Sequence, residues 1–162
     1  TSPDQWTVVH RNDTARGEIF AKRQCMHCLE PACAAACLTK AMEKTPEGPV
    51  IWHPDRCMGC RYCMLSCPFD VPKFEWDSPL PRMIKCQMCL DKAGGQEPGQ
   101  LRDGKEPACC EVCPTDARQL VDLKDPKDPS REFLRHNSIQ VLKPGMATGA
   151  KVYYAGLDGH VR

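Results

Sequence analysis

The sequence has few of the side chains that build an ordinary hydrophobic core. Ile, Leu, Val and Phe together make 28 of 162 residues, and aromatic residues make 6%. No run approaches the roughly 20 apolar residues that a membrane-spanning helix needs. A composition this poor in apolar residues suits a disordered chain when net charge is high, but here the formal charge is only +1. The balanced charge also speaks against a nucleic-acid partner, which would call for a basic surface.

Cysteine and proline are abundant instead, at 13 and 15 residues. Disulfides are disfavoured because many of the cysteines stand three positions apart, a separation that rarely gives relaxed disulfide geometry. Zinc sites use two cysteine pairs joined by a linker, and Cys86 and Cys89 with Cys109 and Cys113 have that form. We expect the chain to wrap around an inorganic group that supplies the missing core.

The stretch CMGCRYCMLSCP at residues 57–68 favours iron and sulfur over zinc. It is the bacterial ferredoxin run, in which three thiolates hold one [4Fe–4S] cluster and the fourth reaches a neighbouring one. An upstream group at residues 25–37 has the spacing to exchange its last cysteine with this run, although Leu38 replaces the proline. Two clusters with crossed ligands are therefore predicted: Cys25, Cys28, Cys33 and Cys67 for the first, and Cys57, Cys60, Cys63 and Cys37 for the second.

The upstream group is repeated further along the chain. QCMHC at 24–28 corresponds to KCQMC at 85–89, and EPACAAACLTKA at 30–41 corresponds to EPACCEVCPTDA at 106–117. No second copy of the 57–67 motif accompanies this repeat. Either the repeat closes a third cluster alone, or it shares a fourth with a motif upstream of Thr1 or on another chain. Its candidate ligands are Cys86, Cys89, Cys109 and Cys113, and Cys110 is interpreted as a small buried apolar residue with ligation as the alternative.

These motifs resemble the iron–sulfur electron-transfer (beta) subunits of the dimethyl sulfoxide reductase, formate dehydrogenase and polysulfide reductase group. They are also similar to subunits of periplasmic nickel–iron hydrogenases. The likeness covers residues 18–123, and the tail VLKPGMATGAKVYYAGLDG resembles the strap that ends many members. It implies three [4Fe–4S] clusters, or four if a first cysteine group lies upstream of residue 1.

The resemblance also implies a function and partners. Single electrons would pass between a large catalytic subunit, of molybdopterin or nickel–iron type, and a quinone- or haem-containing membrane or multihaem cytochrome subunit. The complex would be membrane-associated, with the periplasmic side favoured and the cytoplasmic face as the alternative. No nucleophile–base pair or phosphate-binding loop is present, so no catalysis is assigned to this chain. A free-standing polyferredoxin carrier is the alternative function.

The predicted fold is α+β, a loop-rich ferredoxin-like arrangement with repeated cluster-binding motifs. It divides into a multi-cluster domain over 1–123 and a C-terminal strap over 124–162. Strands are predicted at 48–53 and 118–123, a helical turn at 32–37, and a connector at 124–132. The segment 150–157 is expected either to form an edge strand or to lie along a partner.

Side chains around the motifs invite further predictions. His27 is expected to face solvent, with donation to sulfur as the alternative. Four aromatic residues are expected to shield the clusters from water: Tyr62, Phe69, Phe74 and Trp76. Five cations could either offset cluster charge or lie in solvent: Arg56, Arg61, Lys73, Arg82 and Lys85.

Overall fold

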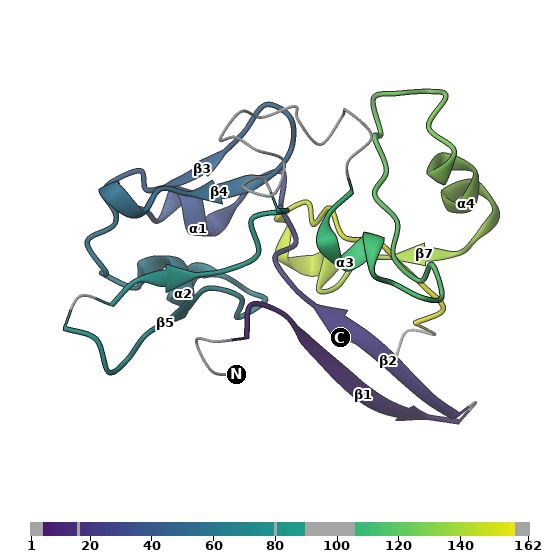
Figure 1. The fold of residues 1–162 in the computed structure, drawn as a ribbon, viewed down its shortest axis with the longest axis horizontal. Helices are drawn as coiled ribbons and strands as arrows, with labels where there is room; N and C mark the ends of the chain where they lie inside the picture. Colours follow the sequence, from purple (N-terminus) through teal and green to yellow (C-terminus); the bar gives the residue numbers. More distant parts are fainter. Residues whose placement is uncertain (1–4, 16, 80, 90–105, 158–162) are drawn as a thin grey trace.

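The computed structural model describes residues 5–15, 17–79, 81–89 and 106–157 (Figure 1). Within these ranges every element is short, and the longest have seven residues. The strands are β1 (Val8–Thr14), β2 (Gly17–Arg23), β3 (Met42–Lys44), β4 (Val50–Trp52), β5 (Lys73–Phe74), β6 (Met83–Ile84), β7 (Ile139–Gln140) and β8 (Tyr154–Ala155). The helices are α1 (Ala32–Ala35), α2 (Tyr62–Ser66), α3 (Ala108–Glu111) and α4 (Ser130–His136), with 3₁₀ turns η1 (Pro54–Arg56) and η3 (Pro144–Met146).

The described strands form four separate antiparallel pairs: β1 with β2, β3 with β4, β5 with β6, and β7 with β8. The β1–β2 hairpin extends away from the rest of the chain in Figure 1. Its register runs from Val8 opposite Arg23 to Thr14 opposite Gly17, and the Thr14 hydroxyl donates to the Gly17 carbonyl at 2.7 Å. A two-stranded pair is marginally stable alone, so these pairs depend on what they pack against.

All three cysteine groups end in the same turn. In each, the residue three positions after the last cysteine has a positive φ, namely 53° at Lys40, 53° at Asp70 and 48° at Asp116. The N–H of that residue donates to the carbonyl of the cysteine, at 3.2, 3.2 and 3.4 Å respectively. The turn forms after Cys37 although Leu38 replaces the proline found after the other two. The repeat in the sequence is thus a repeat of backbone conformation.

The described residues form two buried apolar clusters, and cysteines belong to both. One cluster includes Cys25, Met26, Phe69 and Val71, and the other includes Cys63, Phe74 and Met83. The segment after α4 adds Leu142 and Leu157 to the first cluster. Backbone hydrogen bonds tie this segment to the first cysteine group: Lys151 N–H to Met26 O at 2.8 Å, Leu29 N–H to Gly149 O at 2.9 Å, and Glu30 N–H to Thr148 O at 3.0 Å.

The mixture of short helices and strands agrees with the predicted α+β composition. The helical turn within 32–37 is present as α1, and the strand within 48–53 as β4. The strand predicted at 118–123 is wrong, since those residues pair with no neighbouring strand in the described chain. In the 150–157 segment only Tyr154–Ala155 is paired. No helix among the described residues is both long and apolar enough to cross a membrane.

The predicted connector at 124–132 is wrong for its last three residues, because α4 begins at Ser130. The carboxylate of Asp128 accounts for the start of this helix. It accepts hydrogen bonds from the N–H of Ser130 at 2.8 Å and from the N–H of Asp122 at 2.6 Å. One side chain therefore ends the loop and fixes the first turn of the helix.

Candidate metal centres

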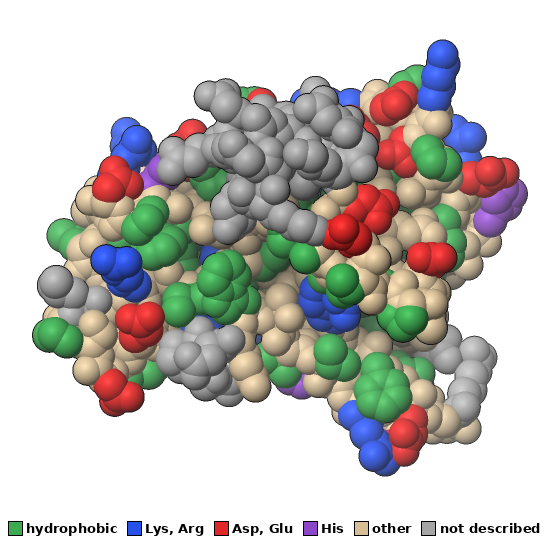
Figure 2. All heavy atoms as spheres, viewed as in Figure 1, with side chains coloured by type: hydrophobic (Ala, Val, Ile, Leu, Met, Phe, Trp, Pro, Cys, Tyr) green, Lys and Arg blue, Asp and Glu red, His purple; other side chains and the backbone are tan. Residues whose placement is uncertain are grey.

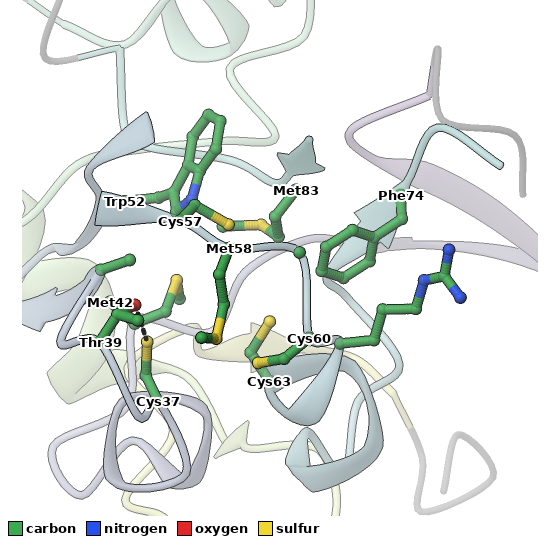
Figure 3. Close-up of a pocket in the computed structure, with 13 residues that line it drawn as sticks. Cys37, Thr39, Met42, Trp52, Cys57, Met58, Cys60, Cys63, Phe74 and Met83 are labelled. Atoms are coloured by element: carbon green, nitrogen blue, oxygen red, sulfur yellow. Dashed lines mark hydrogen bonds between the residues drawn. The ribbon is translucent and has the colours of Figure 1, made fainter. Parts of the chain in front are cut away.

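Four cysteines from two separate motifs line one cavity (Figure 3). Cys37 comes from the loop after α1, while Cys57, Cys60 and Cys63 come from the η1–α2 segment. Apolar side chains complete the wall, including Phe74 and Met83, which are 1% and 0% exposed. We call this cavity the second site. Four soft thiol ligands in an apolar cavity fit an iron–sulfur cluster well.

The thiols of the second site differ in their acid–base environment. Burial raises the pKa of Cys63 to about 11, and the neighbouring thiols of Cys57, Cys37 and Cys60 add to the effect. Burial also acts to raise the pKa of Cys37, but hydrogen bonds outweigh it and the pKa is lowered. The donors are the backbone N–H groups of Thr39, Ala41 and Met42 and the Thr39 hydroxyl, whose oxygen lies 3.8 Å from the sulfur. These hydrogen bonds therefore favour the thiolate form that a metal requires.

The first site comprises Cys25, Cys28, Cys33 and Cys67. Burial raises the pKa of Cys33 to about 12, and the nearby sulfurs of Cys25, Cys67 and Cys28 contribute in the same direction. Burial likewise raises the pKa of Cys67, with Cys25 and Cys28 again among the neighbours. The structure thus brings Cys67 close to the upstream motif and Cys37 close to the downstream one, while the crossed ligation of two clusters stays a prediction.

The third group, Cys86, Cys89, Cys109 and Cys113, is less closely assembled. Cys86 packs against the first apolar cluster, where burial raises its pKa and Cys25 is a neighbour. Cys109 lies on α3, and although burial acts against it, Lys22 and Arg118 lower its pKa. Among the described residues, no three His, Cys, Asp or Glu side chains are placed to hold one metal ion together. Ligands of a [4Fe–4S] cluster are spread more widely, because each binds a different iron.

Cys113 repeats the surroundings of Cys37. Its sulfur lies 3.7 Å from the Thr115 hydroxyl oxygen, and hydrogen bonds from this residue lower its pKa. The backbone N–H groups of Ala117 and Arg118 also lower its pKa. Cys110 is half-buried beside Cys109, and burial, followed by the effect of Cys109, raises its pKa to about 12.

The profile of one protein family, described as a 4Fe-4S dicluster domain, matches residues 17–123. The chain belongs to this 4Fe-4S dicluster family. Its relatives include the hydrogenase-2 operon protein HybA of Escherichia coli O157:H7, 41% identical over 68% of this chain and 33% of HybA. A tetrathionate reductase subunit of Salmonella typhimurium is 31% identical over 98% of this chain and 60% of its own length. The formate dehydrogenase iron-sulfur subunit of Haemophilus influenzae is 35% identical over 69% of this chain and 34% of its own length.

The dicluster chain therefore spans about a third to three-fifths of the length of these relatives. The family match covers both crossed cysteine motifs and continues through the third group.

His27 departs from the prediction made for it. Its side chain is 1% exposed, so the expectation that it faces solvent is wrong. A φ of 44° places residue 27 in the left-handed region, and the imidazole Nδ1 accepts a hydrogen bond from the N–H of Val50 at 3.0 Å. Burial lowers its pKa well below the ordinary value, and the nearby Lys85 and Lys44 add to this shift. The imidazole is therefore neutral, with its proton on Nε2.

The other side chains around the motifs divide into buried and exposed sets. Phe69 and Phe74 are buried beside the sites, as predicted, whereas Tyr62 and Trp76 are exposed and do not shield them. Trp76 instead stacks with Arg61, whose guanidinium carbon lies 4.2 Å from the ring centroid. Lys85 is the only one of the five candidate cations that is buried; the others are Arg56, Arg61, Lys73 and Arg82.

Proposed function

We propose that this chain relays single electrons through [4Fe–4S] clusters between a catalytic oxidoreductase subunit and a quinone- or haem-containing membrane partner. The observation that carries this proposal is the meeting of Cys37 with Cys57, Cys60 and Cys63 around one apolar cavity (Figure 3). Two adjacent sites that exchange a ligand place two redox centres close together. The proposal includes a ferredoxin-like arrangement of the two motifs. Each bound cluster would take up and release one electron without large rearrangement of the protein.

The chain's own residues hold these centres and keep water away. Cys25, Cys28, Cys33 and Cys67 would ligate the first cluster, and Cys37, Cys57, Cys60 and Cys63 the second. Phe69 and Val71 pack on the first site, while Phe74 and Met83 pack on the second. Loading would displace protons from thiols such as Cys33 and Cys63, because burial keeps them neutral in the metal-free chain.

The third group would supply a further cluster through Cys86, Cys89 and Cys109. Cys113 accepts from the same kinds of donor as Cys37, a threonine hydroxyl and backbone N–H groups. Cys37 is the proposed ligand that reaches across to another motif. This likeness favours Cys113 as a ligand to a fourth cluster rather than to the one held by its own group. The count would be four when a further cysteine motif completes that centre, and three otherwise.

A fixed partner is favoured over a freely diffusing polyferredoxin by the surface near the second site. Leu38, Met58 and Leu65 stand next to ligands or on α2, and are 68%, 62% and 75% exposed. Exposed apolar side chains beside a redox site suit a surface that a partner covers. Acidic and basic side chains are interspersed over the face in Figure 2, which suits a protein partner better than nucleic acid. The relatives' names, as subunits of a reductase and a dehydrogenase, support a place in such a complex.

Iron and acid-labile sulfide per chain, measured on anaerobically purified protein together with its intact mass, test the proposal. With four irons per cluster, roughly 12 irons on a chain of 18.1 kDa would mean three clusters, and roughly 16 on a heavier chain would mean four. About 8 would leave the third group without a cluster. A protein without labile sulfide would overturn the proposal. Cys110→Ala is the matched control and should keep the full iron content.

A further inference from the structure

Lys85 is a buried cation without a counter-ion in the described structure. Its side chain is 2% exposed, and its ammonium donates to the carbonyl oxygens of Val50 and, at 3.0 Å, of Cys86. None of the ion pairs found in the described ranges includes it. Carbonyl dipoles satisfy its hydrogen bonds but leave its charge uncompensated, and burying an unpaired charge is strongly unfavourable. An anionic group is therefore expected beside it.

The acidic groups near Lys85 are the thiols of the proposed centres. Cys86 packs against the first apolar cluster together with Cys25, Cys28 and Cys67, and Cys33 packs against the cluster that includes Val50. Cys33 belongs to the first site, and Cys86 follows Lys85 in the third group. An iron–sulfur centre held by these thiolates would carry net negative charge and would supply the charge that balances the ammonium.

The lysine is held at this position by the edge of β4. The Val50 carbonyl accepts from Lys85, the Val50 N–H donates to His27 Nδ1 at 3.0 Å, and the Trp52 N–H donates to Gln87 Oε1 at 3.1 Å. Side chains from the first and third cysteine motifs thus form hydrogen bonds with the edge of β4 that does not pair with β3. The location of the ammonium is set by backbone groups and does not depend on a flexible surface contact.

His27 provides a second observation that points to an acceptor in this region. Its Nε2 is buried and has no hydrogen-bond partner among the described residues. Because Nδ1 accepts from Val50, Nε2 carries the proton and is a donor. A buried N–H without an acceptor is costly, and cluster sulfur is an acceptor that the first site would supply. The Lys85 ammonium and the His27 imidazole are both held by hydrogen bonds to the backbone of Val50.

We propose that Lys85 is the counter-cation of the cluster at Cys25, Cys28, Cys33 and Cys67, and that it raises the reduction potential of that cluster. This inference rests on the proposed function. Reduction adds one negative charge to the centre, and a fixed cation stabilises the reduced form more than the oxidised form. Burial makes the effect larger than that of a surface lysine, whose charge is screened by water and salt. Lys85 is thus a positioning residue that sets the potential without ligating iron.

The test is a redox titration of the intact, anaerobically purified protein, followed by electron paramagnetic resonance. Lys85→Gln keeps a hydrogen-bond donor and removes the charge, while Lys85→Arg keeps the charge. The signal of the first site is identified by its change in Cys33→Ser. We expect Lys85→Gln to lower the midpoint potential of that signal by about 59 mV. For a one-electron couple this shift corresponds to a tenfold change in the reduction equilibrium constant. Lys85→Arg and the exposed-site control Lys124→Gln should stay near the wild-type value.

Three results would overturn the inference: unchanged midpoints in Lys85→Gln with full iron content, an equal shift in Lys85→Gln and Lys85→Arg, or a shift confined to a signal that Cys33→Ser leaves intact. If Lys85→Gln loses the first cluster while Lys85→Arg retains it, the need for charge is supported. If both lose it, the role is structural and the inference is wrong. Wild-type protein without a cluster at Cys33 would instead refute the proposed function.

Discussion

Two double substitutions separate crossed ligation from ligation within each motif. Cys25 and Cys67 belong to one site in the structure, although 42 positions separate them, whereas Cys25 and Cys37 lie in one motif but in different sites. Cys25→Ala/Cys67→Ala should therefore remove two ligands from one cluster and leave the other complete. Cys25→Ala/Cys37→Ala should remove one ligand from each of two clusters.

The expected sizes follow from the ligand sets. Cys25→Ala/Cys67→Ala should lower the iron content by about four per chain and abolish one paramagnetic signal, while the second-site signal keeps its wild-type form. Cys25→Ala/Cys37→Ala should alter both signals, because neither cluster retains four thiolates. Iron analysis and electron paramagnetic resonance on the same anaerobic samples measure both quantities. Cys110→Ala combined with Cys25→Ala controls for the removal of two cysteines and should affect one signal alone.

The reverse pattern would refute the crossed arrangement. If Cys25→Ala/Cys37→Ala abolished one signal and spared the other, Cys37 would serve its own motif. Its place beside Cys57, Cys60 and Cys63 would then not reflect ligation. An equal change in both doubles would mean that the two sites fold only together, and the single variants Cys37→Ala and Cys67→Ala would then have to give the same spectrum.

Three further predictions concern packing. Phe74→Ala should lower the free energy of unfolding by about 3–5 kcal/mol in denaturant titrations, since the ring is 1% exposed beneath the second site, and a loss under about 1 kcal/mol would contradict this packing. Burial raises the pKa of Tyr154 to about 12, so a difference absorbance titration against Tyr154→Phe should show ionisation near that pH. The stabilisation of the folded state by the neutral phenol is fully present below the unfolded pKa of about 10 and is lost as pH rises to about 12. Ionisation near a pH of about 10 would refute the burial. Gly149→Ala should cost about 1–3 kcal/mol because φ is +59° and the new Cβ would lie 2.9 Å from Leu29 Cβ, whereas Gly145→Ala, with open space around it, should be close to neutral.

Features set by local spacing were predictable from the sequence, while those set by distant partners were not. The proximity of Cys37 to the 57–63 cysteines follows from short cysteine intervals, and β4 follows from an apolar run after Pro49. The segment 118–123 has a similar run, but it finds no strand to pair with in the described structure. Helix α4 was missed because its start depends on the Asp128 carboxylate, and two nearby prolines pointed to an irregular connector.

His27 and Lys85 illustrate the same limit at the candidate site. Both stand in or beside a C-x-x-C pair, and this adjacency alone was compatible with burial or with solvent exposure. Their burial depends on Val50, which is 23 residues from His27 and 35 from Lys85. The positive φ at residue 27, uncommon for a residue other than glycine, turns the imidazole toward that strand. Residue type and spacing alone do not predict the hydrogen bond of Val50 with His27 or with Lys85.

The shortness of the elements links the stability of this fold to its redox chemistry. Helices of four to seven residues and isolated two-stranded pairs are not stable on their own. Each apolar cluster that they pack against includes cysteines, so the bound centres would complete the core as well as conduct electrons. Loading and folding are then one equilibrium. Phe74 lines the second site, and Lys85 is proposed as the counter-cation of the first, so each would affect both folding and cluster loading. A substitution there should change the stability of the loaded protein together with the potential of the neighbouring centre.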